Sequence, residues 1–245
     1  MTPPLFALDD LFFAYPDGPE ILRGVSFAFE PGQRIGLHGP NGSGKSTFFL
    51  LVAGLLKPTA GHIRFHGEII TREKDFRALR REVGLVLQNA EDQLFHATVL
   101  EDVAFGPLNL GFSPKDARER AAETLERLGL EHLADRLIHR LSGGEKRLIA
   151  LASILSMRPR ALLLDEPTND LDPLSQKKLM NILHGLEGGW IIISHDVDFL
   201  RATCTHFIGI EDRRIVSRDK PHPHQHLHAH PLGDSPHVHH LQGEE

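Results

Sequence analysis

The pattern of apolar and polar positions predicts a chain that begins with antiparallel strands. Three short apolar runs, FALDDLFFAY, VSFAFE and RIGLHG, start between Phe6 and Arg34 and are separated by the turn sequences PDGPE and PG. Short runs bounded by glycine and proline are typical of strands joined by tight turns. We expect this antiparallel start to lead into a buried strand, which the apolar run STFFLLVAGLL follows at once as a helix.

The remaining pattern alternates strands and helices. After HIRFHGEII, the run VGLVL indicates a second short strand, and the residues from Thr98 to Leu141 have helical character. Within them, Ser113 and Pro114 are typical of a helix start and Gly129 of a helix end. The runs ALLLD and WIIIS indicate fully buried parallel strands, separated by a helix from about Pro173 to Leu186. The pattern therefore predicts an α/β fold with a mostly parallel core sheet.

Composition narrows the function classes. The 245-residue chain is 40% apolar and 24% charged, and its formal charge of -6 argues against a nucleic-acid partner. Cys204 is the single cysteine, which excludes an internal disulfide. The longest apolar run, Phe48 to Leu56, is far shorter than the roughly 20 residues that cross a bilayer. Since no secretory pattern opens the chain, we expect a cytoplasmic protein that serves a membrane only by docking onto other chains.

The segment GPNGSGKS, from Gly39 to Ser46, matches the phosphate-binding pattern G-x-x-x-x-G-K-[ST] at every fixed position. It follows a predicted strand and opens a predicted helix, as the pattern requires; a glycine-rich turn without a ligand is the alternative. In such a loop, N–H groups point at phosphate oxygens, Lys45 reaches the β- and γ-phosphates, and Ser46 binds Mg²⁺. The predicted nucleotide contacts are Gly39, Asn41, Gly42, Ser43, Gly44, Lys45, Ser46 and Thr47.

Two adjacent carboxylates, Asp165 and Glu166, end the predicted strand ALLLD. Ligands of open α/β sheets gather at the carboxyl ends of the strands. Asp165 is therefore a candidate Mg²⁺ ligand, and Glu166 is a candidate group to orient or deprotonate an attacking water. Such a pair also occurs at solvated strand edges and helix caps, but next to a phosphate loop it indicates an ATPase.

The segment LSGGE, from Leu141 to Glu145, precedes an apolar helix and distinguishes one class of phosphate-loop ATPase from the others. With the loop and the carboxylates, it makes the chain resemble the ATP-binding subunits of ABC transporters from Leu5 to Ile215. The resemblance implies an ABC-type P-loop ATPase over residues 1–217, with an N-terminal antiparallel β subdomain and a helical subdomain at about residues 95–141. It also implies ATP and Mg²⁺ as cofactors.

The resemblance implies roles for four further residues. Tyr15 stands where an aromatic residue stacks on adenine, and Gln88 where a glutamine links the γ-phosphate and Mg²⁺ to the membrane partner. Asp172 lies in the loop after the carboxylates, and His195 stands where a histidine contacts the γ-phosphate. The implied catalytic residues are Lys45, Gln88, Glu166 and His195.

The segment LSGGE also looks like a second anion cradle, because Ser142, Gly143 and Gly144 offer a hydroxyl and N–H groups at a helix start. In ABC proteins this cradle completes the site of the opposite subunit. The resemblance thus implies a homodimer, or a heterodimer with a related chain, that closes on ATP and opens on hydrolysis. Two departures from the usual pattern, Glu145 in place of glutamine and the loop from Asn169 to Asp172, remove no phosphate contact.

The stretch from Val83 to Gly111 is similar to the ATPases of energy-coupling factor importers, which take up vitamins, cobalt or nickel. The similarity implies two integral membrane partners, a coupling protein and a substrate-binding protein, and a position at the cytoplasmic face of the membrane. In these ATPases the region after the glutamine receives helices of the coupling protein. The segment AEDQLF suits a basic, apolar helix, because acids precede Leu94 and Phe95; a subdomain that packs only on itself is the alternative.

Residues 218–245 lack apolar periodicity and are rich in histidine, which predicts a disordered tail. Imidazoles suit Ni²⁺, Co²⁺, Zn²⁺ and Cu²⁺. Because only the neutral ring binds metal, capture should weaken as the pH falls through about 6.5. A purification tag and a tail without a role are the alternatives. The candidate ligands are His222, His224, His226, His228, His230, His237, His239 and His240.

The tail favours a nickel or cobalt importer over a vitamin importer. A metal-storage or delivery protein with a regulatory nucleotide site is a further alternative. An ABC-type ATPase of DNA maintenance or translation is disfavoured, because such proteins usually carry a coiled-coil insertion or two cassettes. His38 and His96 show no ligand spacing and are interpreted as packing or surface residues.

Overall fold

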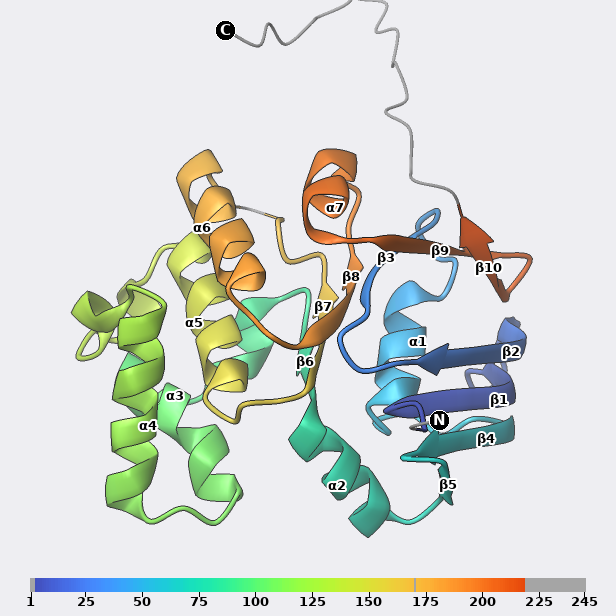
Figure 1. The fold of residues 1–245 in the computed structure, drawn as a ribbon, viewed down its shortest axis with the longest axis horizontal. Helices are drawn as coiled ribbons and strands as arrows, with labels where there is room; N and C mark the ends of the chain where they lie inside the picture. The colour runs from blue at the N-terminus through green and yellow to red at the C-terminus, as the bar shows by residue number, and fades with distance from the viewer. Residues whose placement is uncertain (1–2, 170, 219–245) are drawn as a thin grey trace, which may run out of the picture.

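The computed structural model describes residues 3–169 and 171–218 (Figure 1). The predicted tail ligands, from His222 to His240, lie outside these residues. Two sheets and a group of helices make up the described chain. Within it, no helix combines the length and the apolarity of a membrane span.

The N-terminal sheet is antiparallel, as the strand pattern predicts. Its order is β2 (Glu20–Phe29), β1 (Phe6–Ala14), β4 (Ala60–Phe65) and β5 (Glu68–Ile70). Phe6 on β1 pairs with Phe29 on β2 and with Phe65 on β4. β4 packs closely against β1: at Gly61, with φ of 82°, an added Cβ would lie 2.3 Å from the carbonyl oxygen of Asp10. Glycine is therefore required where β4 begins.

The larger sheet confirms the predicted α/β class. Its order is β10 (Arg214–Arg218), β9 (His206–Glu211), β3 (Arg34–His38), β8 (Gly189–Ile193), β7 (Ala161–Asp165) and β6 (Val83–Val86). All neighbours are parallel except β10, which runs antiparallel at the edge. Every residue of β7 and β8 is buried. The last strand includes Arg218, one residue beyond the predicted domain end.

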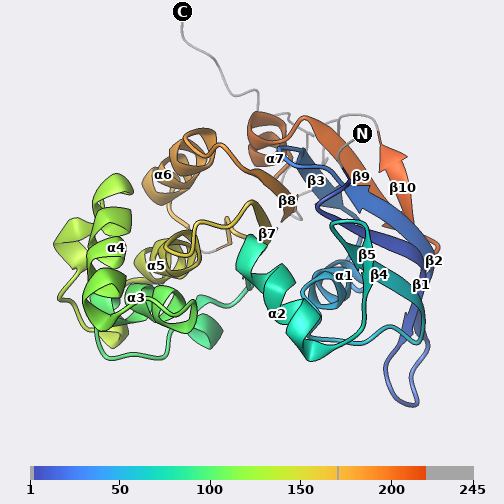
Figure 2. The same ribbon diagram turned by 60° about the horizontal axis from the view of Figure 1, so that its bottom comes forward.

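Helices lie on both sides of the larger sheet. They are α1 (Lys45–Val52), α2 (Glu73–Glu82), α3 (Val99–Asn109), α4 (Pro114–Arg127), α5 (Gly143–Leu155), α6 (Pro173–His184) and α7 (Val197–Thr203). Figure 2 shows α3, α4 and α5 grouped at the end of the molecule opposite the antiparallel sheet. The predicted limits of α4 are confirmed. The Ser113 hydroxyl accepts a hydrogen bond from the N–H of Asp116 at the start of the helix, and Gly129, with φ of 62°, follows its end.

The side chains of β7 alternate between two apolar cores. Leu162 and Leu164 belong to the core under α3, α4, α5 and α6. Ala161 and Leu163 belong to the core that joins α1 to the antiparallel sheet. Because β7 is packed on both faces, its carboxyl end, where Asp165 lies, is held in a fixed position.

Candidate nucleotide site

The loop between β3 and α1 bends around a cavity. Gly42 and Gly44 have positive φ values of 76° and 100°. At Gly44, the N-cap of α1, an added Cβ would lie 2.8 Å from the side chain of Ile21. The loop conformation therefore requires glycine, and it brings the first turn of α1 to the cavity wall.

The cavity has a volume of about 560 Å³, which is in the range of small-ligand sites. Gly39 and Ser43 belong to the loop but do not line the cavity. The Ser43 hydroxyl is buried and has no hydrogen-bond partner within the described chain. The predicted site residues that line the cavity are Tyr15, Asn41, Gly42, Gly44, Lys45, Ser46, Thr47, Gln88, Asp165, Glu166 and His195.

The ammonium group of Lys45 lies against the loop that precedes it. Its Nζ donates hydrogen bonds to the carbonyl oxygens of Gly39, at 2.8 Å, and Pro40, at 3.0 Å. Burial lowers the pKa of Lys45, while the charges of Glu166 and Asp165 oppose that shift. Lys45 thus places a cation between the loop and the two carboxylates.

Asp165 is a buried carboxylate with one unsatisfied oxygen. It is 5% exposed, and burial raises its pKa while a hydrogen bond with Ser46 and the charge of Lys45 oppose the shift. Its Oδ1 has no hydrogen-bond partner among residues 3–169 and 171–218. A carboxylate oxygen and a hydroxyl are the oxygen ligands that Mg²⁺ prefers. The residues at this point of the cavity therefore fit a magnesium ion.

Glu166, directly after β7, and His195, just after β8, meet at the wall of the cavity. The backbone N–H of His195 donates to Glu166 Oε2 at 3.3 Å. The His195 Nε2 lies 3.0 Å from Asn41 Oδ1 and 3.3 Å from Glu166 Oε1. Since both neighbours are acceptors, Nε2 carries a proton and donates. Burial raises the pKa of Glu166, and the charge of His195 opposes that shift.

Tyr15 and Gln88 lie where the cavity opens. Tyr15 is 43% exposed and packs edge-to-face on Phe13, with ring centroids 4.9 Å apart. Its hydroxyl lies 3.4 Å from Thr47 Oγ1. Gln88 follows β6 and is exposed. An exposed aromatic ring at the cavity mouth is available to stack on a planar base.

Ser142, Gly143, Gly144 and Asp172 do not line this cavity. We call the start of α5, from Ser142 to Glu145, the signature surface; Ser142 and Gly143 are exposed there, and Gly144 is buried. There the Ser142 hydroxyl accepts from the N–H of Glu145 at 3.2 Å, and the Glu145 carboxylate accepts from the N–H of Ser142 at 2.8 Å. This capping box starts α5. Hydrogen bonding with the Ser142 backbone lowers the pKa of Glu145.

Asp172 caps α6 next to the signature surface. Its Oδ1 accepts from the N–H groups of Leu174 and Ser175, at 2.9 and 3.1 Å. A Cβ added to Gly144 would lie 3.6 Å from Asp172 Oδ2, so the starts of α5 and α6 are close neighbours. The sequence predicted Asp172 as a site residue, but within one chain its side chain serves as a helix cap.

Three residues that the sequence did not single out as contacts also line the cavity: Ile21, Asn169 and Ile193. Asn169 comes three positions after Glu166, and Ile193 ends the strand beside β7. Their positions follow from the strand order, which the local pattern does not contain. The bond between Asn41 and His195 joins residues 154 positions apart and has no local signal either.

A second cavity, of about 260 Å³, lies between the segment after Gln88 and the start of α5. We call it the groove; its lining residues are Glu91, Leu94, Phe95, His96, Ala97, Ile138, His139 and Lys146. Phe95 is 71% exposed, whereas Leu94 packs partly against the core. Glu91 and Lys146 form an ion pair, and hydrogen bonding with Lys146 lowers the pKa of Glu91.

The histidines of the described chain form no metal site. No group of three or more His, Cys, Asp or Glu side chains in residues 3–169 and 171–218 has a metal-binding arrangement. His96 lies 3.5 Å from Asp102 and its ring packs on Phe105, with centroids 4.9 Å apart. The interpretation of His96 as a packing residue agrees with these contacts.

Comparison with known proteins decides the family. The family model described as ABC transporter matches residues 22–169, which include the phosphate loop, LSGGE and both carboxylates. The chain belongs to the ABC transporter family. It is thus an ABC-type ATPase, and its fold confirms the expected combination of an antiparallel β subdomain, a mostly parallel sheet and a helical region.

Similar proteins narrow the type of this ABC ATPase. It is 52% identical to a putative ABC transporter ATP-binding protein of Nitratidesulfovibrio vulgaris over 98% of this chain and 88% of that protein. It is 45% identical to the energy-coupling factor transporter ATP-binding protein EcfA of Methanosphaera stadtmanae over 84% of this chain and 76% of that one. It is also 45% identical to the cobalt import ATP-binding protein CbiO of Rhodobacter capsulatus over 81% and 72% of the two chains.

Solved structures agree. The structure of cbiO1 from Clostridium perfringens, part of the ABC transporter complex cbiONQ, aligns with a TM-score of 0.78, 34% identity and 89% coverage of each chain. A dimeric bacterial ABC transporter cassette aligns with a TM-score of 0.79 and 27% identity, over 88% of this chain and 98% of that one. The chain is therefore an ATP-binding subunit of the energy-coupling factor type.

Proposed function

We propose that this subunit hydrolyses ATP to power the import of cobalt or nickel through integral membrane partners, at the cytoplasmic face of the membrane. The observation that carries the proposal is that the phosphate loop, Asp165, Glu166 and His195 meet around one cavity of about 560 Å³. The metal is supported by the names of relatives, a cobalt import ATP-binding protein and a component of cbiONQ.

In this proposal the residues from Gly39 to Thr47 hold the phosphates of ATP, and Lys45 exchanges its loop carbonyls for β- and γ-phosphate oxygens. Ser46, Asp165 and Gln88 hold Mg²⁺, which supplies positive charge to the phosphates when bound. Tyr15 stacks on the adenine. The unsatisfied Asp165 Oδ1 and the hydrogen bond of Asp165 with Ser46 support this division of roles.

Glu166 acts as the base that orients and deprotonates the attacking water. Its carboxylate is 5% exposed, and burial raises its pKa, which makes the ionised form a stronger base. His195 Nε2, which lies 3.0 Å from Asn41 Oδ1, donates a hydrogen bond to the γ-phosphate when ATP is bound. Since hydrolysis needs ionised Glu166, we expect the rate to fall as the pH drops through its pKa.

The signature surface completes the site of a second subunit, which is either an identical or a related chain. The exposed residues Ser142 and Gly143 present a hydroxyl and an N–H group at the start of α5, next to the cap of α6, and Gly144 follows them in the first turn. Since these residues lie outside the chain's own cavity, they are free to contact the phosphates bound by the partner. The dimeric cassette among the similar structures supports this arrangement.

The groove receives a helix of the integral membrane coupling protein, which acts together with a substrate-binding membrane protein. Phe95 offers an exposed aromatic contact, and Glu91 offers a carboxylate that already pairs with a cation, Lys146. A partner helix with apolar residues and an arginine or lysine matches both features. The groove adjoins Gln88, so that docking takes place next to the nucleotide cavity.

The groove is tested with the double variant Glu91→Lys and Phe95→Ala. We expect ATP-driven uptake to fall at least about tenfold, because a charge reversal and a lost aromatic anchor each cost about 1–3 kcal/mol of binding. ATP turnover by the isolated subunit should stay within about twofold of wild type, since neither residue lines the nucleotide cavity. Loss of both activities, with a lowered melting temperature, would indicate misfolding and contradict the docking role.

The tail histidines, from His222 to His240, lie outside the described residues, and their role rests on the sequence. We expect them to collect the metal ion on the cytoplasmic side. Titration calorimetry with NiCl₂ and CoCl₂ compares the full chain with a chain truncated after Lys220. Metal binding by the full chain alone, which weakens below about pH 6.5, supports the proposal; equal binding by both chains contradicts it.

The metal is tested by mass spectrometry of cell-associated cobalt and nickel in cells that carry wild type, Lys45→Ala or the truncated chain. We expect Lys45→Ala to abolish uptake of one ion, while truncation changes only its level. If neither ion depends on Lys45, the metal assignment fails and a vitamin becomes the favoured solute. Stoichiometric metal binding without ATP turnover would instead favour a storage or delivery protein.

A further inference from the structure

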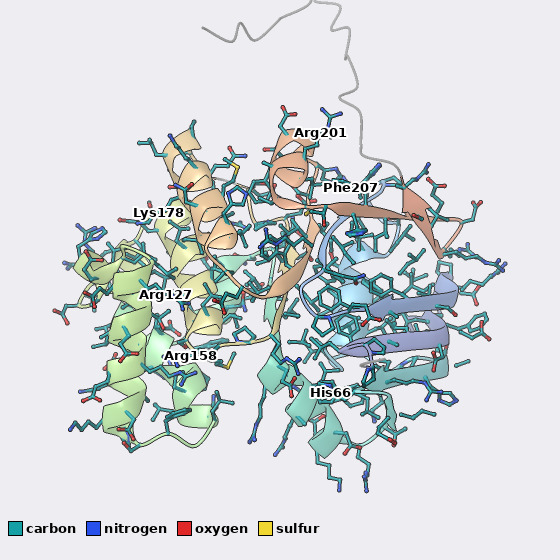
Figure 3. All side chains as sticks on the ribbon, viewed as in Figure 1. His66, Arg127, Arg158, Lys178, Arg201 and Phe207 are labelled. Carbon is teal, nitrogen blue, oxygen red and sulfur yellow. The ribbon has the colours of Figure 1, made fainter. Side chains whose placement is uncertain are left out.

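Arg147 lies on α5, directly after the LSGGE segment and Lys146, and it is buried, with 8% of the residue exposed. Its Nη1 donates a hydrogen bond of 2.8 Å to the backbone carbonyl oxygen of Glu166. Three arginines near other helix ends are instead exposed: Arg127 at the end of α4, Arg158 just after α5, and Arg201 on α7 (Figure 3). A buried arginine is destabilising unless its donors are satisfied, and the carbonyl oxygen of Glu166 satisfies one donor of Arg147.

The backbone of Glu166 has an unusual conformation. Its φ is 46°, in the left-handed region that residues other than glycine rarely adopt. Its N–H donates to the carbonyl oxygen of Ile193 at 2.9 Å, and its carbonyl accepts from Arg147 at 2.8 Å and from the N–H of Asn169 at 3.2 Å. Hydrogen bonds on both sides therefore hold this residue in a strained conformation, from which its carboxylate reaches the N–H of His195.

We infer that Arg147 is a positioning residue for ATP hydrolysis, which fixes the Glu166 carboxylate at the nucleotide cavity by holding the Glu166 carbonyl from α5. The inference rests on the proposed role of Glu166 and extends it to a residue that does not line the cavity. α5 carries the signature surface at its start and the contact with Glu166 in its second turn. A movement of α5 relative to β7 thus changes the geometry of the chain's own catalytic carboxylate.

A purely structural role for Arg147, as a tie between the helical region and β7, leads to different results. Losing a tie lowers the fraction of folded molecules, so that ATP binding and hydrolysis fall together. Losing a positioning contact lowers kcat per folded molecule and leaves ATP affinity unchanged. Activity per ATP-binding molecule separates the two roles.

The test uses Arg147→Lys and Arg147→Met, with Arg120→Lys and Arg120→Met as matched controls. Arg120 also donates to a backbone carbonyl, that of Ser156 at the end of α5, at 2.6 Å, but it does not contact Glu166. We expect Arg147→Met to lower kcat per ATP-binding molecule by roughly 30-fold, since misplacing a reacting group by about 1 Å costs up to about 100-fold. The Kd of a fluorescent ATP analogue stays within about threefold of wild type. Arg147→Lys, which keeps one donor, recovers part of the rate, and both Arg120 variants keep the wild-type kcat.

The inference is overturned if Arg147→Met retains the wild-type kcat per ATP-binding molecule, or if Arg120→Met loses as much activity as Arg147→Met. Glu166→Gln distinguishes this failure from failure of the proposed function. If Glu166→Gln still hydrolyses ATP, the catalytic role of Glu166 is wrong, and the inference fails with it. If Glu166→Gln is inactive while Arg147→Met is fully active, only the positioning role fails.

Discussion

The carboxylates of the nucleotide cavity and of the signature surface have pKa values that are shifted in opposite directions. In the cavity, Asp165 and Glu166 are each 5% exposed, and burial raises the pKa of both. On the signature surface, Glu145 caps a helix start, and hydrogen bonding with the Ser142 backbone lowers its pKa. The cavity contains a polar atom, Asp165 Oδ1, without a hydrogen-bond partner in the described part of the chain, and a ligand can bind it. On the signature surface, Ser142 and Glu145 form hydrogen bonds with each other.

The contrast teaches which region depends on a ligand and which on a partner. The orphaned Asp165 Oδ1 and Ser43 Oγ, which find no partner among the described residues, lie at or beside the phosphate loop. Ser142 and Glu145 instead form a completed capping box, which leaves Ser142 and Gly143 exposed at the start of α5. We therefore expect substitutions in the cavity to act on one chain, and substitutions on the signature surface to act on assembly.

The largest effect is expected from Lys45→Ala. Its ammonium lies between the loop carbonyls and the two carboxylates, so its loss removes the cation that we propose binds the β- and γ-phosphates. ATP hydrolysis should fall by at least about 100-fold, as for the loss of one electrostatic donor to a transition state. Steady-state phosphate release measures it, and circular dichroism confirms the fold. A residual rate within tenfold of wild type would contradict the assigned role.

A smaller effect, on assembly alone, is expected from Ser142→Ala. The substitution removes a helix cap and a hydroxyl from the signature surface, which costs about 1 kcal/mol of stability. ATP binding by the single chain should remain unchanged in a fluorescence titration, while ATP-driven association weakens by about fivefold or more. Ser113→Ala is the matched control, because Ser113 caps α4 in the same way but lies away from the signature surface. Equal weakening of association in both variants would remove the distinction between the regions.

The smallest effect is a gain of stability in Asp165→Asn. The pKa of Asp165 is raised in the folded chain, so its contribution to stability is present below the unfolded pKa and is lost as the pH rises through the folded pKa. Removing the buried charge should therefore raise the melting temperature at pH 8, by about 2–4 °C for roughly 1 kcal/mol, and have little effect near pH 4. Calorimetry at both pH values measures the difference. A lower melting temperature at pH 8 would show that Lys45 and Ser46 already compensate the carboxylate.

The sequence predicts the parts of the site that local patterns encode. The glycines that need positive φ and the hydroxyl at the start of α1 stand at fixed spacing in one segment, and the two carboxylates are adjacent at the end of β7. Ser142 and Glu145 also have the spacing of a capping box, which is a local signal for the start of α5.

The rest of the site depends on contacts between distant segments. The order of β3, β8 and β7 brings Asn41 to His195, and the packing of α5 brings Arg147 to Glu166, although neither pair has a spacing pattern. The φ of 46° at Glu166 is likewise imposed by hydrogen bonds from β8 and α5 and not by residue type. Local periodicity gives the elements, whereas packing decides which of their ends meet.

The most direct test of the central claim measures the mass of Glu166→Gln by light scattering, with MgATP and with MgADP. If the signature surface of one chain completes the cavity of another, slowed hydrolysis should hold a dimer with ATP and leave a monomer with ADP. Adding Ser142→Arg, which places a bulky side chain on the signature surface, should return the ATP sample to a monomer. A Glu166→Gln chain that binds ATP and stays monomeric would contradict the account.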